Sequence, residues 1–308
     1  MDEGQSRSFH VVKVALLTNV IIVLMKTGAA IFTGSSVLLA EAFHSAADTS
    51  NEVLLLLGIK LSRRPPDREH PFGYGKEGYF WGFVVSILIF GIGAGLSVFE
   101  GIHKILRPHP LHNIKVGYVI LGISALCDFL SWRVAFKEFM PLIKRLGFFG
   151  AIKKSKTPAI FIVLLEDTAG LLGVILAFLT LSLSQILGNV VFDGLGSIGI
   201  GVLLGFVAFL VSRETKSLLI GEAVSEDDLQ KIREAVKRVS EVQEVLELLT
   251  MHLGPDEVLV NVNVNFVDGL NTDQVEEAID KVEKAIRSVL PTVKQVFVEA
   301  ESLRREKV

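Results

Sequence analysis

The sequence predicts an all-α domain of six transmembrane helices followed by a small α+β domain. Half of the 308 residues are hydrophobic and the mean hydropathy is +0.50, which is too high for an ordinary soluble domain. The apolar residues gather in six long segments within the first two-thirds of the chain, and the remainder is polar. We therefore expect a transmembrane domain over residues 1–216 and a cytoplasmic domain over residues 217–308.

The two predicted domains differ in charge as well as in hydropathy. From Glu222 onward 19 acidic residues outweigh 11 basic ones, whereas the preceding part holds 20 basic and 15 acidic residues. Such a shift favours two parts that meet different surroundings. The net charge of −3 gives no indication of nucleic-acid binding, and the single Cys127 excludes a disulfide or a thiolate metal cluster within one chain.

Each apolar segment has the roughly 20 residues that a helix needs to cross a bilayer. The first is interpreted as a spanning helix and not as a cleaved signal peptide, because it is long and lacks a small-residue cleavage pattern. The six expected spans are approximately Val11–Thr33, Val37–Leu61, Tyr79–Ile102, Ile114–Phe136, Ala159–Leu183 and Val190–Val211.

Lysine and arginine gather in two of the loops between these spans. The positive-inside bias places both loops in the cytoplasm, and an even number of spans then places both termini there too. We expect a multi-pass protein of the plasma (inner) membrane. The basic residues are Arg63, Arg64, Arg68 and Lys76 between the second and third spans, and Lys144, Arg145, Lys153, Lys154 and Lys156 between the fourth and fifth.

The polar part alternates between helix and strand patterns. Ser225 precedes three acidic residues, as an N-cap does at the start of a helix. Residues 242–253 and 258–266 are predicted strands, and the second alternates an apolar face with a face made mostly of asparagines. Residues 272–290 carry a helical apolar stripe, and residues 293–298 form a last strand. The order αββαβ favours a ferredoxin-like sandwich.

Ionisable residues lie near the middle of two predicted spans, where a charge is costly and indicates a functional site by default. The second span contains Glu41, His44 and Asp48, which share one side of a helix because they are three and four residues apart. The fifth span contains Glu166 and Asp167. If these two helices are neighbours, one imidazole and two or three carboxylates converge at one depth.

An imidazole together with carboxylates suits a divalent metal ion, and these groups also titrate. Four such ligands match tetrahedral zinc, although manganese, iron(II) and cobalt accept similar sets. The pattern therefore indicates a membrane protein that handles metal cations in exchange for protons. In the opposing interpretation, each charge pairs with Lys26, Arg133 or a backbone carbonyl and only holds helices together.

Four motifs, in the right order, resemble those of the cation diffusion facilitator family and cover nearly the whole chain. EAFHSAAD (residues 41–48) is similar to the family's HxxxD motif in the second helix, and RPPDREHPFGYGK (residues 64–76) is similar to its cytoplasmic turn. LIGEA (residues 219–223) resembles its junction to the soluble domain. Asp193 stands where the family often has an aspartate at the start of the sixth helix.

This resemblance implies a transporter, not an enzyme, that exports divalent metal from the cytoplasm against proton entry, with zinc as the first candidate. It also implies a homodimer whose soluble domains meet inside the cell. We expect no cofactor apart from the transported ion. The alternatives are a manganese, iron(II) or cobalt exporter of the same type, a channel, an intramembrane metalloenzyme, and a membrane-anchored metal sensor.

The fifth span departs from the family pattern. Many members carry HxxxD or DxxxD there, but the matching positions in this chain are Val163 and Asp167. Glu166 lies about 60° from position 163 on a helical wheel, within reach of a flexible side chain. We hypothesise a metal site made of His44, Asp48, Asp167 and Glu166, whose three oxygen donors weaken the case for strict zinc selectivity.

Other ionisable residues are weaker candidates for regulatory metal sites. In the cytoplasmic turn, the resemblance implies a further histidine where this chain has Tyr74. We favour turn chemistry for that loop, a solvated face for the acidic residues of the last strand, and packing for the histidine of the soluble domain. The candidates are Asp67 and His70 in the turn, and Glu299, Glu301 and His252 in the soluble domain.

Several polar residues receive structural roles. Lys26 and Glu41 are expected to form an ion pair, since a lone lysine in lipid is costly. His103, His109 and His112 cluster on the predicted outer loop and are expected to be surface residues. The glycines of the third and sixth spans permit close helix contact.

Overall fold

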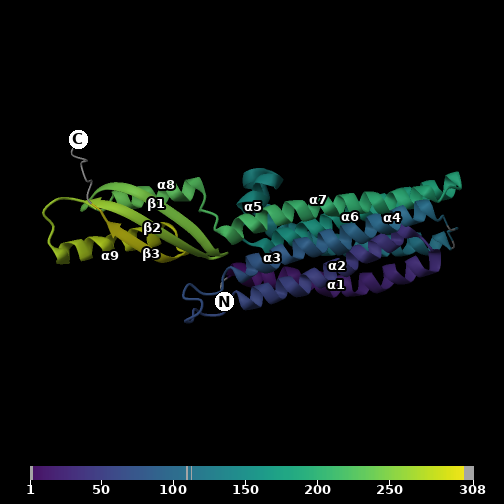
Figure 1. Ribbon diagram of the computed structural model, residues 1–308, viewed down its shortest axis with the longest axis horizontal. Coiled ribbons are helices and arrows are strands. Elements are labelled where there is room, and N and C mark those ends of the chain that lie inside the picture. The colour runs from purple at the N-terminus through teal and green to yellow at the C-terminus, as the bar shows by residue number, and fades with distance from the viewer. Residues whose placement is uncertain (1–2, 109, 112, 302–308) are drawn as a thin grey trace. The chain divides into compact units, whose positions relative to one another are not determined.

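The computed structural model describes residues 3–108, 110–111 and 113–301. Packing divides them into two units, each with its own hydrophobic core (Figure 1). The first unit is helical and contains the residues up to Arg63 together with Glu77–Lys216. The second contains the loop Arg64–Lys76 together with the residues from Ser217 onward.

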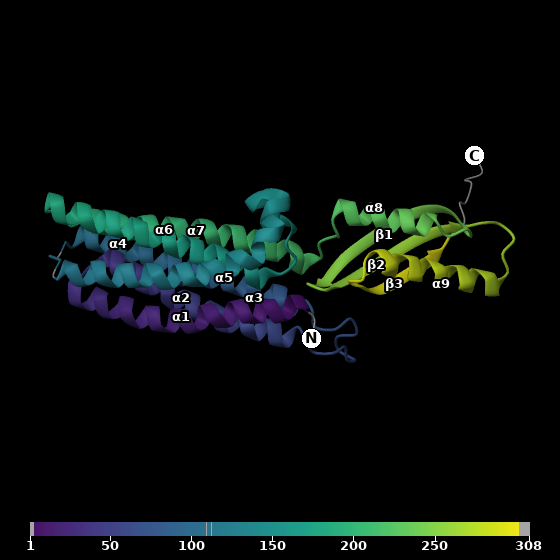
Figure 2. The same ribbon diagram turned by 180° about the vertical axis from the view of Figure 1, so that it is seen from behind.

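Helices fill the first unit and follow the predicted spans. The third predicted span is one continuous helix made of three consecutive parts, α3, η1 and α4. Figure 2 shows α5 lying beside both α1 and α6, which it contacts. The elements are α1 (Glu3–Thr33), α2 (Ser36–Leu61), α3 (Glu77–Leu88), η1 (Ile89–Gly95), α4 (Leu96–Leu106), α5 (Ile114–Lys154), α6 (Pro158–Leu187) and α7 (Val191–Ile220).

Length and composition qualify five helical segments of the described chain as membrane spans, one fewer than the six expected. The predicted span Val37–Leu61 does form the 26-residue helix α2. It is not among the qualifying segments, and it carries three buried acidic residues, Glu41, Asp48 and Glu52. The five qualifying segments are Phe9–Thr33, Glu77–Leu106, Ile114–Phe148, Pro158–Leu187 and Val191–Ile220.

The third apolar segment has a wider middle. Between the α-helices α3 and α4, the segment η1 is a π-helix that contains Gly91, Gly93 and Gly95. Farther along, α4 packs closely on α7, because a Cβ on Gly101 would lie 2.5 Å from the carbonyl oxygen of Gly194. Gly194 of the sixth span thus permits a close helix contact, as expected for the glycines of that span.

α5 is longer than predicted. The span was expected to end at Phe136, but helical residues continue to Lys154, in two stretches separated by a kink at Gly147. At Gly147 the backbone leaves helical geometry, with φ 71° and ψ 170°, and the last turns bend away from the bundle axis (Figures 1 and 2). Phe139 and Ile152 are 4% and 5% exposed and join the core, so packing sustains the helix beyond the apolar span.

Asp193 ties together three helix ends in the first unit. Its buried carboxylate accepts hydrogen bonds from Oγ of Ser35 at 2.5 Å and from N and Oγ of Ser36 at 2.7 and 2.9 Å. Nζ of Lys104, near the end of α4, lies 3.9 Å from the same carboxylate and donates to the carbonyl oxygen of Gly34 at 2.8 Å. The start of α7, the α1–α2 turn and the end of α4 are thereby joined.

The second unit has the predicted element order αββαβ. Its sheet runs in the order β1-β2-β3, with β1 and β2 antiparallel and β2 and β3 parallel. α9 makes the crossover between the two parallel strands. The elements are α8 (Glu226–Lys237), β1 (Val242–Gly254), β2 (Glu257–Phe266), α9 (Thr272–Val289) and β3 (Val293–Ala300).

The core of the second unit follows from the alternation along β2. Val260 and Val262 are fully buried and share one face of the sheet, where Ile232 of α8 and Ile286 of α9 pack against them. The predicted N-cap Ser225 is confirmed, since its Oγ accepts from the backbone N of Asp228 at 3.3 Å. Helix propensity, capping and strand periodicity thus point to the same structure.

An ion pair on the surface of the second unit gives a pH-dependent prediction. The ammonium of Lys281 donates to Glu241 at 2.7 Å, and hydrogen bonds from Lys281 and Ser240 lower the pKa of Glu241 to about 2. A carboxylate with a depressed pKa stabilises the fold above its unfolded pKa of 4.5, and this contribution is lost as the pH falls towards 2.

We expect Lys281→Met to lower the unfolding temperature of the second unit at pH 7, and the difference from the unsubstituted chain to shrink between pH 4.5 and pH 2. Scanning calorimetry of the full chain measures both. Lys284→Met, at an exposed position on the same helix, is the control. A difference that stays constant over this pH range would contradict the assignment.

Candidate functional site

The predicted site residues come from two helices that contact each other. α2 carries His44 and Asp48, and α6 carries Glu166 and Asp167. The four residues are buried, with exposed fractions of 2%, 8%, 2% and 8% in that order. The two helices are therefore neighbours, as a metal site shared between them requires.

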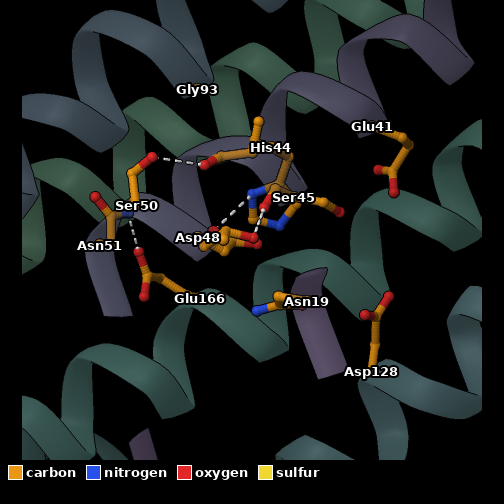
Figure 3. Close-up of polar contacts among 12 residues, drawn as sticks. Asn19, Glu41, His44, Ser45, Asp48, Ser50, Asn51, Gly93, Asp128 and Glu166 are labelled. Atoms are coloured by element: carbon orange, nitrogen blue, oxygen red, sulfur yellow. Dashed lines mark hydrogen bonds and ion pairs between the residues drawn. The ribbon is translucent and has the colours of Figure 1, made fainter. Parts of the chain in front are cut away.

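The two ring nitrogens of His44 have different surroundings. Nδ1 lies 3.2 Å from Oδ1 of Asp48, as the four-residue spacing predicts (Figure 3). Nε2 is buried without a hydrogen-bond partner among the described residues. It faces Gly170 of α6, where a Cβ would lie only 3.2 Å away. A buried imidazole nitrogen without a partner is a group that can bind a metal ion.

Neutral side chains donate hydrogen bonds to the two carboxylates of α6. Asn51 of α2 donates from Nδ2 to Glu166 at 2.5 Å (Figure 3). Ser131 of α5 donates from Oγ to Asp167 at 2.9 Å. Both carboxylates lie close enough to Asp48 for the charges to interact. Each therefore belongs to the same polar region as Asp48 without bonding to His44.

The structure brings the predicted ligands onto facing helices but does not assemble them around one point. Within the described residues, no three His, Cys, Asp or Glu side chains are arranged to hold an ion. Asn51 and Ser131 each bond to one oxygen of these carboxylates, which leaves the second oxygen of Glu166 and of Asp167 for an ion. The ligand assignment stays a prediction.

Sequence reasoning overlooked two polar residues of this region. Glu52 is 1% exposed and accepts a hydrogen bond from Nδ2 of Asn19 at 2.7 Å, and its charge interacts with that of Asp48. It lies one helical turn after Asp48, so the same four-residue spacing could have identified it. Ser131 carries no charge and follows no motif, and only the packing of α5 on α6 identifies it.

The predicted ion pair between Lys26 and Glu41 is confirmed. Nζ of Lys26 lies 2.8 Å from Oε2 of Glu41, and both side chains are almost completely buried. The same ammonium lies 3.7 Å from Oδ2 of Asp128 on α5. Charged side chains from three helices therefore meet beside the candidate site.

The turn formed by residues 64–76 is held by its own hydrogen bonds. Asp67 accepts from the hydroxyl of Tyr74 at 2.7 Å and from the backbone N of Glu69 and His70 at 2.9 and 2.7 Å. The bond from Tyr74 is the main reason that the pKa of Asp67 falls below its ordinary value. Nδ1 of His70 lies 3.8 Å from Asp67. These bonds fit the turn interpretation of this loop.

The candidate regulatory metal ligands in the second unit occupy different environments. Glu299 and Glu301 are exposed, and Glu301 accepts a hydrogen bond from Asn263 of β2. His252 is 7% exposed, and its backbone N donates to the carbonyl oxygen of Glu222 at 2.9 Å. An exposed acidic edge and a buried histidine fit the solvated-face and packing interpretations.

The predicted outer-loop histidines are only partly described. His103 belongs to α4 and not to a loop, and its ring stacks on that of Phe99 with the centroids 6.3 Å apart. The helix continues past the predicted end of the span, which accounts for this difference. His109 and His112 lie outside the described residues.

Two family models match the chain. The cation efflux transmembrane domain matches residues 12–220, and the cytoplasmic domain of cation efflux proteins matches residues 224–303. The two matched ranges together cover most of the chain.

Curated proteins from distant organisms are similar to the chain. The mitochondrial proton-coupled zinc antiporter SLC30A9 of Homo sapiens is 36% identical over 259 residues, which are 83% of this chain and 45% of that protein. Metal tolerance protein C4 of Arabidopsis thaliana is 29% identical over 85% of this chain and 58% of its own length. The cation-efflux pump FieF of Escherichia fergusonii is 26% identical over 88% of this chain and 85% of its own length. The chain thus spans about half the length of the first two.

The bond between Asn51 and Glu166 gives a stability prediction. Asn51→Leu removes the donor and leaves a buried carboxylate without compensation, which we expect to lower the free energy of unfolding by about 1.5–3 kcal/mol. Thermal unfolding of the detergent-solubilised chain measures the loss. Ser50→Ala, on the exposed side of the same helix, is the control and should change little. Equal stability of the two variants would argue against this contact.

Proposed function

The chain belongs to the cation efflux family, also known as cation diffusion facilitators, and on that premise we propose that it exports a divalent metal ion, with zinc as the first candidate, in exchange for protons. Members of this family are transporters and not enzymes. The observation that carries the proposal is the buried Nε2 of His44, which lacks a hydrogen bond while Nδ1 of the same ring meets Asp48.

The proposed ion site consists of His44 and Asp48 of α2 with Asp167 and Glu166 of α6. Support comes from their burial, from the contact between the helices, and from the charge interaction that links Asp48 to both α6 carboxylates. An arriving divalent cation would attract the second oxygen of each α6 carboxylate, because a double charge in a low-dielectric region interacts far more strongly than an amide or a hydroxyl.

The same ligands provide the coupling to protons. Imidazole and carboxylate must lose their protons to bind a metal, so the affinity of the site falls as the pH falls. On an acidic external side, protonation would release the ion, and the protonated empty site would return to the cytoplasmic side. Rocking of helix groups around a mid-membrane site would provide the alternation of access.

The proposed topology has six spans, with α2 as the span that hydropathy alone does not qualify. A charged helix is tolerated at bilayer depth when it faces the bundle interior, and the buried charges of α2 do so. Both termini would then be cytoplasmic. The host would be a proton-energised membrane, either the plasma (inner) membrane expected from the sequence or, as in the name of the human relative, a mitochondrial one.

The second unit is proposed to be the cytoplasmic, ferredoxin-like part of a homodimer. Support comes from the αββαβ order, the three-stranded sheet with helices packed on one face, and the match to the family's cytoplasmic domain. Manganese, iron(II) and cobalt are alternative ions, because three oxygen donors accept harder metals. Metal-dependent partner binding without flux would instead favour a membrane-anchored sensor.

Flux measurements in proteoliposomes test the proposal. We expect a pH gradient to drive zinc uptake, and Asp48→Ala or His44→Ala to lower the rate by more than about 100-fold, because losing a ligand costs more than losing a partner of a ligand. Glu234→Ala, which removes an exposed carboxylate of the second unit, is the control. A pH jump that moves no metal through the unsubstituted chain would overturn the proposal.

The ligand set predicts how selectivity can be changed. Val163 is 1% exposed and lies one turn before Asp167 on α6. We expect Val163→His to add a nitrogen donor and to raise the preference for zinc over manganese about tenfold. Competition between the two ions in the same flux assay measures the ratio. Val163→Ala controls for the altered packing, and an unchanged ratio would place the ion away from this part of α6.

A further inference from the structure

The proposed transport function makes no use of a group of positive charges near the end of α5. Lys144 and Arg145 precede the kink at Gly147, and Lys153 and Lys154 follow it in the last turn of the helix. All four of these charged side chains are exposed. We call residues 144–154 the basic elbow.

The positive charges of the basic elbow are not balanced by neighbouring acidic residues. The sequence contains no aspartate or glutamate between Phe139 and Leu165. In the part of the chain that the structure describes, none of the four cations takes part in an ion pair. The end of α7 differs, because Glu214 lies between Arg213 and Lys216. The elbow therefore offers four uncompensated cations to a partner of opposite charge.

The bend at Gly147 decides where the second pair of cations lies. In a straight α-helix, a residue nine positions later lies about 14 Å farther along the axis and on the opposite side. Gly147 instead has φ 71°, and Figures 1 and 2 show the following turns bent away from the bundle axis. Ala151 and Ile152 of these turns are buried in the core of the first unit. The second pair is therefore held against the bundle and does not project beyond it.

The bend also coincides with the end of an apolar segment that is long enough to span a membrane. That segment is Ile114–Phe148, so its last residues belong to the elbow. Leu146 and Phe148, on either side of Gly147, are half-buried, and exposed cations flank them in the sequence. Basic and apolar residues that are mixed at the end of a span are typical of a segment at the level of the lipid headgroups.

We propose that the basic elbow binds the headgroups of anionic phospholipids in the leaflet that faces the cytoplasmic side. This inference rests on the topology given under the proposed function, which places the end of α5 on that side. Lysine and arginine form charge-assisted hydrogen bonds with phosphate oxygens. Their long apolar stems can lie along the apolar side chains of the elbow while the charged ends reach the headgroups.

The second unit is the alternative partner, because from Glu222 onward 19 acidic residues outweigh 11 basic ones. The continuity of the elbow with an apolar span favours the lipid. The half-buried Leu146 and Phe148 favour it too, since acyl chains can contact them while the headgroup meets the cations. If the acidic unit occupied the elbow, neutralising the cations would leave the affinity for lipid unchanged.

Lipid titration of the full chain in detergent, read by native mass spectrometry, tests the proposal. We expect phosphatidylglycerol to bind at least tenfold more tightly than phosphatidylcholine. The double substitution Lys144→Gln and Arg145→Gln should lower the affinity for phosphatidylglycerol about 25-fold, because each cation near a lipid surface contributes about fivefold.

A matched control is available at the end of α8. Lys237 and Arg238 are the same two residue types at adjacent exposed positions of the second unit. Lys237→Gln with Arg238→Gln removes the same charge and should leave the affinity for phosphatidylglycerol unchanged. An equal loss in the two double variants, or no loss at the elbow, would overturn the proposal.

The role of the bend is tested separately from the charge. Gly147→Ala keeps all four cations but opposes the positive φ, which glycine adopts far more readily than alanine. We expect it to lower the affinity for phosphatidylglycerol at least fivefold. Gly122→Ala, on the same helix with open space around it, is the control. A folded Gly147→Ala chain with unchanged affinity would reject the elbow as the binding surface.

Failure of this inference is distinguishable from failure of the proposed function, because lipid binding in detergent requires no flux. If the unsubstituted chain transports zinc but does not discriminate between the two lipids, the transport function stands and the elbow proposal falls. Inorganic phosphate that displaced phosphatidylglycerol at millimolar concentration would likewise reject a lipid surface in favour of a general anion site.

Discussion

The cost of holding charge away from water organises the whole first unit. Its helices bury carboxylates, an imidazole and two lysines, and each group needs a partner that it cannot obtain from lipid. Asp193 is satisfied by the turn that starts α2, Glu166 by Asn51, and Asp167 by Ser131. These contacts cross between helices, so the same bonds that neutralise the buried groups also fix how the helices pack. A few atoms remain without a hydrogen-bond partner among the described residues, and Nε2 of His44 and Oε1 of Glu41 are two of them.

Hydropathy, spacing and charge predicted the elements well where one physical signal dominated. The αββαβ order followed from strand alternation and the Ser225 cap, and the Lys26–Glu41 pair followed from the cost of an isolated charge. The end of α5 could not be predicted in this way. Its continuation past Phe136 depends on tertiary burial of Phe139 and Ile152, which local sequence does not reveal.

The candidate site was predictable in residue type and helix face, but not in its detailed bonding. A four-residue spacing is enough to place His44 beside Asp48. No periodicity states which neutral side chain on another helix will reach a given carboxylate, so the partners of Glu166 and Asp167 emerged only from the packed structure. Gly170 is a further example, because only the packed structure shows that it lies opposite Nε2 of His44.

The π-helical segment η1 has a consequence for the span that contains it. A π-turn holds more residues than an α-turn, so the side chains after Gly95 are rotated about the helix axis relative to those before Ile89. Both ends of this span nevertheless meet the same two neighbours: α3 and α4 each contact α2, and a glycine of each, Gly82 and Gly101, lies against α7. Converting the bulge to regular α-helix would rotate one end relative to the other, so that Gly82 and Gly101 would no longer both face α7. The π-turn thus sets the angular phase that keeps the two glycines on one side of the span.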